Sequence, residues 1–199
     1  MLNLFIDIET IPNTNISPAL MDCFNKRKKE EETFEEKAAL HAEYGKVVCI
    51  SLWYTDVSTG EWKTKSFVWS DEALLLAQFA QLLEWKAITF IGHNIKWFDL
   101  PFLTKRYWIH GIPVPPALQF SGKKPREVAV IDTMDLWKTT SRDRVSLEVI
   151  CLALWLPNPK TSTDGSQVYQ LYQANNFDAI ASYCEWDVKA VADVYKRIG

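Results

Sequence analysis

Two acidic residues near the start of the sequence, Asp7 and Glu9, stand one residue apart. Residues 2–9 alternate between apolar and other side chains, which predicts a strand with both carboxylates on one side, about 6.6 Å apart. Carboxylates so placed can converge on one cation, and hard oxygen ligands favour Mg²⁺ or Mn²⁺ over zinc. An edge strand with two solvated acids gives the same pattern, so the pair alone is weak evidence.

A third acidic residue, Asp99, follows a short apolar stretch at residues 87–92 and opens a predicted helix. Active sites of open α/β sheets collect at the carboxyl ends of strands, which makes Asp99 a candidate ligand. Asp99 is also a good N-cap for that helix, because Pro101 follows closely. The two interpretations are compatible.

Tyr183 and Asp187 lie four residues apart on a predicted amphipathic helix at residues 176–198, and therefore on one face of it. That face borders the apolar stripe of the helix, so both side chains are expected to point toward the sheet. A carboxylate in such a position needs a partner or a metal ion. The alternative is a surface aspartate that accepts a hydrogen bond from a neighbouring hydroxyl.

The patterns D-x-E, N-x-x-x-F-D and Y-x-x-x-D each occur once, in this order. In these motifs the sequence resembles the DEDD exonuclease superfamily and its tyrosine-bearing DEDDy branch, most closely the stand-alone exonucleases related to the proofreading domain of family B DNA polymerases. The histidine branch would need a histidine where this sequence has Ser182. The resemblance spans residues 2–198 and is carried by residues 5–12, 98–103 and 183–188, with Ser146-Leu147-Glu148 and Asp164-Gly165 between them.

The resemblance implies an α/β, RNase H-like fold in which a mixed five-stranded sheet is flanked by helices. It also implies two bound divalent cations, Mg²⁺ or Mn²⁺. By the same resemblance, Asp7, Glu9 and Asp187 hold the first cation, and Asp7 with Asp99 holds the second. Such a pair supports in-line hydrolysis of a phosphodiester. Tyr183 would orient the attacking water, since a phenol with an ordinary pKa near ~10 is a better positioner than a base at neutral pH.

The implied activity is a 3′→5′ exonuclease that removes nucleoside monophosphates from the 3′ end of single-stranded DNA. Terminal nucleotides must be splayed to bring one phosphate to the cations, which favours single-stranded ends. An exoribonuclease on the same fold is one alternative, because no residue recognisably reads a 2′-hydroxyl. The other is a non-catalytic nucleic-acid-binding accessory module, although each buried carboxylate would then cost stability without a metal. A polymerase or replication partner would act in trans.

Substrate contacts are expected beside the acids and on one basic loop. The candidates near the acids are Thr10, Asn94 and Phe98. The loop, for which a solvated face is an equal alternative, carries Lys123, Lys124 and Arg126. Two further carboxylates near a strand end, which could cap a helix or support the site from behind, are Asp132 and Asp135.

The elements around these residues run as a strand, an antiparallel hairpin, and then alternating helices and strands, which is typical of one α/β domain around a mixed sheet. Strands are predicted at residues 2–9, 46–55, 61–69, 87–92 and 128–131. Helices are predicted from a cap at Ser70 or Asp71 through Lys86, and at residues 99–110, 146–156 and 176–198.

Residues 13–45 are predicted to form a helical insertion within a single exonuclease domain at residues 1–199. Ser17-Pro18 is typical of a helix start, and Thr33 with Glu36 predicts a capping box. Gly45 is expected to end that second helix. The basic run at 26–29 lies among glutamates, a pattern more typical of a solvated face than of a nucleic-acid contact.

The composition of the chain bears on its nucleic-acid binding, its cysteines and its membrane association. The net charge of −3 disfavours a protein that coats duplex DNA by charge alone, but a carboxylate pocket that binds cations is compatible with it. The four cysteines are scattered, which favours buried free thiols over structural zinc. No apolar run reaches the ~18 residues of a membrane helix, so a cytoplasmic protein with no membrane partner is expected.

Overall fold

A five-stranded sheet forms the centre of the protein. The computed structural model describes residues 2–56, 59–84, 87–120, 122–123, 127–158 and 167–199. The strands are β1 (Leu2–Pro12), β2 (Gly45–Thr55), β3 (Trp62–Val68), β4 (Ile88–Gly92) and β5 (Val130–Asp132). Their order is β3-β2-β1-β4-β5, with antiparallel pairs on the β3 side of β1 and parallel pairs on the β5 side. The prediction of a mixed five-stranded sheet is confirmed.

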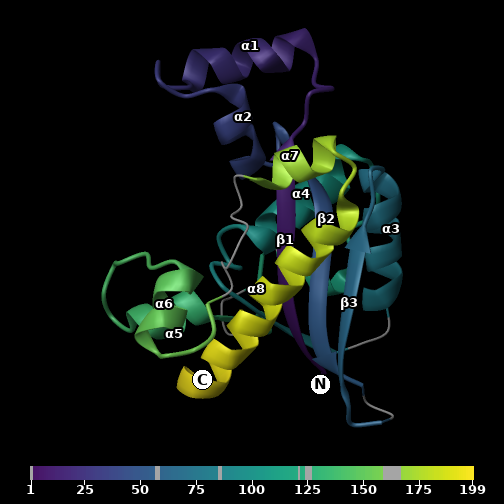
Figure 1. Ribbon diagram of the computed structural model, residues 1–199. Coiled ribbons are helices and arrows are strands. Elements are labelled where there is room, and N and C mark those ends of the chain that lie inside the picture. The colour runs from purple at the N-terminus through teal and green to yellow at the C-terminus, as the bar shows by residue number, and fades with distance from the viewer. Residues whose placement is uncertain (1, 57–58, 85–86, 121, 124–126, 159–166) are drawn as a thin grey trace.

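Helices cover both faces of the sheet. The long helix α8 (Phe177–Ile198) crosses one face diagonally, while α3 (Glu72–Leu83) and α4 (Asp99–Ile109) pack on the other (Figure 1). The shorter helices are α1 (Pro18–Arg27), α2 (Phe34–Lys37), η1 (Ala38–Leu40), η2 (Pro116–Leu118), α5 (Thr133–Lys138), α6 (Leu147–Ala153) and α7 (Val168–Gln173). No helix in the described ranges is both long and apolar enough to span a bilayer.

The alternation predicted for β1 divides its side chains between the two faces. The even-numbered apolar residues 4–8 belong to the core cluster that includes α3 and α4. Phe5 instead packs with Val188 and Val191 of α8. Continued along the strand, the alternation places Asp7 and Glu9 on the face that α8 covers.

Six helix starts have a side-chain cap, whereas α4 and α7 begin without one. The capping box of Thr33 and Glu36 is present, with each side chain accepting from the backbone N–H of the other residue. The other side chains that cap a helix start are Ser17, Asp71, Asp132, Ser146 and Asn176. Two helix ends differ from the prediction, since α3 ends at Leu83 and α6 at Ala153.

Gly45 does not end a helix, contrary to the prediction. It is the first residue of β2, and the helix that starts after Thr33 continues only through η1 to Leu40. A Cβ on Gly45 would lie 2.8 Å from the carbonyl oxygen of Ala38 and 3.2 Å from that of Ile11. The glycine is therefore needed where β1, β2 and η1 come together.

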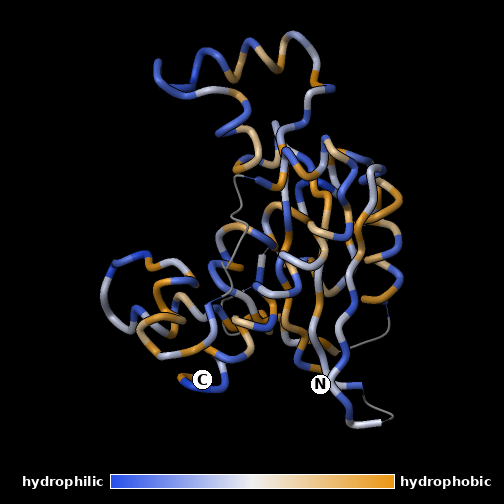
Figure 2. Tube along the Cα trace, viewed as in Figure 1, coloured by the Kyte–Doolittle hydropathy of each residue, from blue (hydrophilic) through white to orange (hydrophobic). Residues whose placement is uncertain are grey.

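The helical insertion between β1 and β2 extends beyond the end of the sheet (Figure 1). Its outer part is mostly hydrophilic (Figure 2), and Lys26 and Arg27 are exposed. Phe24 anchors α1, with ring centroids 5.0 Å from Phe34 and 5.2 Å from Tyr44. The insertion thus has a small apolar contact of its own.

Two short helices, α5 and α7, were not predicted, and β5 begins at Val130 rather than at residue 128. Asp132 ends β5 and caps α5 by accepting from the backbone N–H of Met134, so the helix-cap interpretation of Asp132 is confirmed. Some predicted features lie outside the described residues: the turn at 57–58, the helix end at 85–86, Lys124, Arg126 and Asp164-Gly165.

Candidate active site

Two of the predicted acids lie on β1 beneath α8. Asp7 is opposite Ser51 of β2 and Glu9 is opposite Cys49, and the pairing shifts immediately after Glu9. A ligand atom of Asp7, one of Glu9 and the sulfur of Cys184 all lie within 4.8 Å of one another. The strand β1 and the helix α8 therefore bring together residues from the two ends of the sequence.

Asp99 reaches the same strand from the start of α4. Its Oδ1 accepts a hydrogen bond from the backbone N–H of Ile8 at 3.2 Å, and the residue is 3% exposed. The interpretation of Asp99 as an N-cap is wrong, because Phe98 occupies that position and Asp99 is the first residue of the helix. The Asp99 carboxylate therefore points toward β1, where it meets the backbone of Ile8, the residue between Asp7 and Glu9. It does not cap the start of its own helix.

The turn that precedes Asp99 is held by Asp132. The Asp132 carboxylate accepts from the backbone N–H groups of Asn94 at 2.9 Å and Lys96 at 3.2 Å. Asn94 has a positive φ of 59°, which asparagine tolerates better than most residues. Asp132 thus holds the turn that leads into Asp99. In the sequence, the feature that indicates this role is the position of Asp132 at the end of β5, which the sheet places directly beside Gly92 of β4.

Tyr183 and Asp187 lie on α8 and face the same region. Tyr183 is 8% exposed, and its hydroxyl is hydrogen-bonded to the Asp187 side chain. Between them, Cys184 donates from its thiol to the Asp7 carbonyl oxygen and to Asp7 Oδ2, both at 3.4 Å. Sequence patterns did not indicate this contact, because Cys184 falls in the apolar stripe of the helix.

The pKa values of Asp7 and Asp99 reflect burial and the neighbouring negative charges. Burial, and then the negative charges of Asp99 and Glu9, raise the pKa of Asp7 well above its ordinary value; the charge of Asp187 adds to this shift. Burial also raises the pKa of Asp99 to about 7, against the hydrogen bond from Ile8. Four acids from three elements therefore repel one another at this position.

The phenol of Tyr183 is also affected. Burial, and then the charges of Asp187 and Glu9, raise the pKa of Tyr183 far above its ordinary value. A phenol in this environment stays protonated, and because its proton is donated to Asp187, its oxygen can orient a water molecule by accepting a hydrogen bond from it.

The donor set fits divalent cations. Carboxylate oxygens are the ligands that Mg²⁺ and Mn²⁺ prefer, and mutual repulsion among buried carboxylates is relieved by bound positive charge. The raised pKa of Asp7, caused in part by three neighbouring acids, is the observation in this structure that supports the fit.

The candidate substrate contacts differ in the hydrogen-bonding and packing groups that they have available. Thr10 donates its hydroxyl proton to the carbonyl oxygen of Ala39 at 2.7 Å, which leaves only its acceptor capacity for other partners. Phe98 packs on Phe102 with ring centroids 5.5 Å apart. Among the described residues, Asn94 Oδ1 is a buried side-chain acceptor without a hydrogen-bond partner. Lys123 of the basic loop is exposed.

Two histidines are held in other contacts. The ring nitrogens of His93 lie 3.0 Å from Thr133 Oγ1 and 2.9 Å from the Val145 carbonyl oxygen, and burial lowers the His93 pKa. His110 lies beside Glu72, with 2.8 Å between Nε2 and Oε2.

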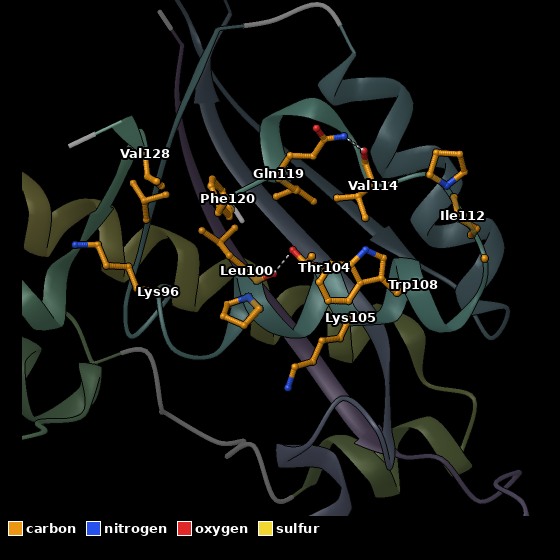
Figure 3. A pocket seen from close by; sticks show the side chains of 15 residues that line it. Lys96, Leu100, Thr104, Lys105, Trp108, Ile112, Val114, Gln119, Phe120 and Val128 are labelled. Atoms are coloured by element: carbon orange, nitrogen blue, oxygen red, sulfur yellow. Dashed lines mark hydrogen bonds between the residues drawn. The ribbon is translucent and has the colours of Figure 1, made fainter. Parts of the chain in front are cut away.

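A cavity of about 1110 Å³ runs along α4 but does not include the predicted site residues. Apolar side chains of α4, of the segment 111–120 and of β5 line it (Figure 3). Its lysines, Lys96 and Lys105, form ion pairs with Asp135 and Glu43. Asp135 therefore pairs with surface lysines instead of facing the acids.

Comparison with known proteins identifies a family. A family model described as a predicted 3′→5′ exonuclease related to the exonuclease domain of PolB matches residues 38–198. This range contains Asp99, Tyr183 and Asp187, and the structure places Asp7 and Glu9 of β1 beside them. No curated protein matches the sequence significantly.

Solved structures share the fold. The crystal structure of E. coli exonuclease I in complex with a dT13 oligonucleotide has a TM-score of 0.53 at 14% identity and covers 99% of this chain and 40% of that one. A product-bound structure of exonuclease I has a TM-score of 0.50 at 16% identity, with 98% and 42% covered. This chain thus spans about two fifths of those proteins, and at these identities the likeness establishes the RNase H-like fold.

Proposed function

The chain belongs to the family of predicted 3′→5′ exonucleases related to the exonuclease domain of PolB, and on that premise we propose that it removes nucleoside monophosphates from the 3′ end of single-stranded DNA. The observation that carries this proposal is the approach of three acids to Asp7: a ligand atom of Glu9 lies within 4.8 Å of one of Asp7, and the charges of Asp99 and Asp187, from two other elements, act on Asp7. Such crowding costs stability unless the charges are compensated.

The compensating charge is assigned to two divalent cations, Mg²⁺ or Mn²⁺. Asp7, Glu9 and Asp187 would hold one of them, and Asp7 with Asp99 the other. Two such cations supply an activated water and neutralise the charge that develops on the leaving 3′-oxygen.

The remaining residues orient the reactants. Tyr183 keeps its proton, so its hydroxyl can hold the attacking water in line with the scissile bond. Asn94 lies in the turn that Asp132 fixes, and is available to contact the terminal nucleotide. Phe98 would contact the terminal base, although its ring already packs on Phe102. To bring one phosphate to the cations, the terminal nucleotides would be splayed and therefore unpaired.

DNA is favoured over RNA on two grounds. The family description refers to the exonuclease domain of PolB, and the exonuclease I structure with the same fold holds a dT13 oligonucleotide. An exoribonuclease remains the second candidate on the same site. A polymerase or other replication partner would be supplied in trans.

The proposal is tested with a 5′-labelled single-stranded DNA oligonucleotide and purified protein. Mg²⁺ or Mn²⁺ should produce a ladder of products that shorten from the 3′ end, and EDTA should stop the reaction. Asp187→Asn should abolish shortening, because it removes a negative ligand without changing the side-chain shape. Asp178→Asn, on an exposed face of the same helix, should leave the rate unchanged.

The rates of shortening of single-stranded RNA and of duplex DNA with the same base sequence, measured in parallel, identify the preferred substrate class. Release of the 5′ label as the first product would show that the polarity is wrong. Equal activity of Asp187→Asn and the wild type would show that the assigned acids are not the catalytic ones.

A further inference from the structure

A sulfur ligand lies within the group of carboxylates. The Cys184 thiol sulfur is 3.4 Å from Asp7 Oδ2, and ligand atoms of Asp7, Glu9 and Cys184 lie within 4.8 Å of one another. A tetrahedral zinc ion holds a sulfur and an oxygen ligand about 3.5 Å apart. The contact between Cys184 and Asp7 therefore already has the separation that two ligands of one such cation would need.

A second thiol adjoins the first. Cys49 lies on β2 opposite Glu9 and packs in the same buried cluster as Cys184. Both cysteines are 0% exposed. The sulfur of Cys49 thus adjoins the group formed by the Cys184 sulfur and the two carboxylates of β1.

Neighbouring hydroxyls fix the position of Cys49. Its sulfur lies 3.5 Å from Ser51 Oγ, which lies 2.9 Å from Ser66 Oγ, and Ser66 donates to Glu185 Oε1 at 2.6 Å. This chain of hydrogen bonds joins β2 and β3 to α8 close to Cys184. Polar partners behind a ligand hold it in the orientation that a metal requires.

We propose that Cys184, Asp7 and Glu9, with Cys49 packed beside them, form a binding site for a thiophilic divalent cation, of which Zn²⁺ and Cd²⁺ are the test ions. Thiolate sulfur selects such ions over Mg²⁺, and binding releases the thiol protons to solvent without any redox step. Because Asp7 is also assigned to both catalytic cations, occupancy of the sulfur site withdraws it from them. The thiophilic ion is therefore an inhibitor; this consequence rests on the proposed function, whereas the binding itself does not.

The binding is tested by titrating Cd²⁺ into the protein without Mg²⁺ and recording the ultraviolet sulfur-to-cadmium charge-transfer band. The reference protein carries Cys23→Ser, because Cys23 is exposed and would bind Cd²⁺ independently. A saturable band is expected in the reference. Adding Cys184→Ser, which keeps a donor to Asp7, should remove most of the band and weaken Zn²⁺ binding measured by calorimetry roughly 10–100-fold.

Cys151→Ser in the same background is the matched control, since Cys151 is also buried but belongs to the core cluster of α6. It should retain the full band. A band that survives Cys184→Ser, or no band in the reference protein, overturns the proposal. Circular dichroism confirms that each variant is folded before it is titrated.

Inhibition is measured separately, as the Zn²⁺ concentration that halves Mg²⁺-dependent DNA shortening. Cys49→Ser should raise that concentration at least about tenfold. Unchanged sensitivity to Zn²⁺ would overturn the inhibitory role. A charge-transfer band in a protein that shortens no DNA would leave the sulfur site standing and refute the proposed function.

Discussion

Asp99 is the most deeply buried of the four acids, and its environment stabilises the protonated form. Burial raises its pKa to about 7 from an ordinary 3.8, and the hydrogen bond from Ile8 offsets only part of that shift. The folded protein therefore binds a proton at Asp99 more tightly than the unfolded chain does. Without a cation, ionising this group destabilises the fold.

This shift predicts an inverted pH dependence of stability. Between about pH 4 and 7 the contribution of Asp99 to the free energy of unfolding falls as pH rises, and the loss is complete above the folded pKa. Mn²⁺ should therefore raise the melting temperature more at about pH 8 than at about pH 5, because the cation replaces the proton. Differential scanning fluorimetry with EDTA or Mn²⁺ measures both effects.

Asp99→Asn is the control, since it removes the titrating group and keeps the side-chain shape. It should flatten the pH dependence in EDTA and reduce the gain from Mn²⁺. In EDTA, the change in stability between pH 5 and pH 8 is compared for the wild type and Asp99→Asn. If the two proteins change by the same amount, the raised pKa is not that of Asp99.

Tyr183→Phe is predicted to lower the rate of DNA shortening about 10–100-fold, because the attacking water loses the hydroxyl that orients it. Metal affinity should change little, since the carboxylates remain. Single-turnover kinetics and Mn²⁺ titration separate the two quantities. A large loss of Mn²⁺ binding with normal turnover at saturation would show that the tyrosine orders Asp187 rather than the water.

At the level of residues, the sequence identified the acids but not everything around them. Asp7, Glu9, Asp99 and Asp187 stand in recognisable motifs. Cys184 was not found, because a cysteine in an apolar stripe has the same pattern as a core residue. Whether Asp99 faces its own helix or β1 depends on the packing of two distant segments, which spacing does not encode.

Among the elements, α6 ends with an unusual residue. Trp155 has a positive φ of 57°, is 96% exposed, and lies at the position after the helix where glycine is favoured. The backbone N–H groups of Trp155 and Leu156 donate to the carbonyl oxygens of Leu152 and Cys151, the hydrogen bonds of a Schellman motif.

Trp155→Gly should therefore stabilise the fold by about 0.5–1 kcal/mol. The left-handed conformation costs an L-residue about 1–2 kcal/mol, of which the greater freedom of glycine in the unfolded chain offsets about 0.5–1 kcal/mol. Urea unfolding measures the change. A loss of stability would instead show that the indole makes a contact the fold needs.

Asn175→Gly is the matched control, because Asn175 follows α7 with φ 55° and the same pair of hydrogen bonds. Asparagine tolerates this conformation, so the gain should be smaller than for Trp155→Gly. An equal gain at both positions would mean that side-chain type does not decide the strain.

Helix starts were predictable and several helix ends were not, for a physical reason. A capping side chain such as that of Ser17 or Ser146 can be recognised from the residue type alone. The end of α3 or α6 depends instead on backbone hydrogen bonds and on the segments that pack next to it. The helix α5 has six residues, too few for a periodic pattern. Gly45 resembled a helix end, but it is required because a side chain would clash where three segments come close together.

On the scale of the molecule, a buried ion pair connects the layers that carry the site. Arg106 of α4 forms an ion pair with Glu72 of α3 and donates to the Ala42 carbonyl oxygen at 2.8 Å. Glu72 in turn accepts from the backbone N–H of Val47 at 2.7 Å. These contacts fix the end of the helical insertion beside β2, close to the point where Thr10 is bonded to Ala39.

The resemblance to an exonuclease family predicted the sheet and its flanking helices, because the motifs imply that fold. It did not predict how the insertion at residues 13–45 is placed, because none of the motifs that carry the resemblance lies within it. The attachment of the insertion depends on single contacts, such as the one between Arg106 and Ala42, that no sequence pattern reveals.

The central claim is that acids from β1, α4 and α8 share a pair of divalent cations. A crystal structure of the protein grown with Mn²⁺, with anomalous scattering recorded to locate the ions, tests this directly. Two manganese ions are expected, with Asp7 about 2.0–2.2 Å from both, Glu9 and Asp187 on one, and Asp99 on the other. Manganese bound away from these carboxylates, or Asp99 turned from the ions, would contradict the account.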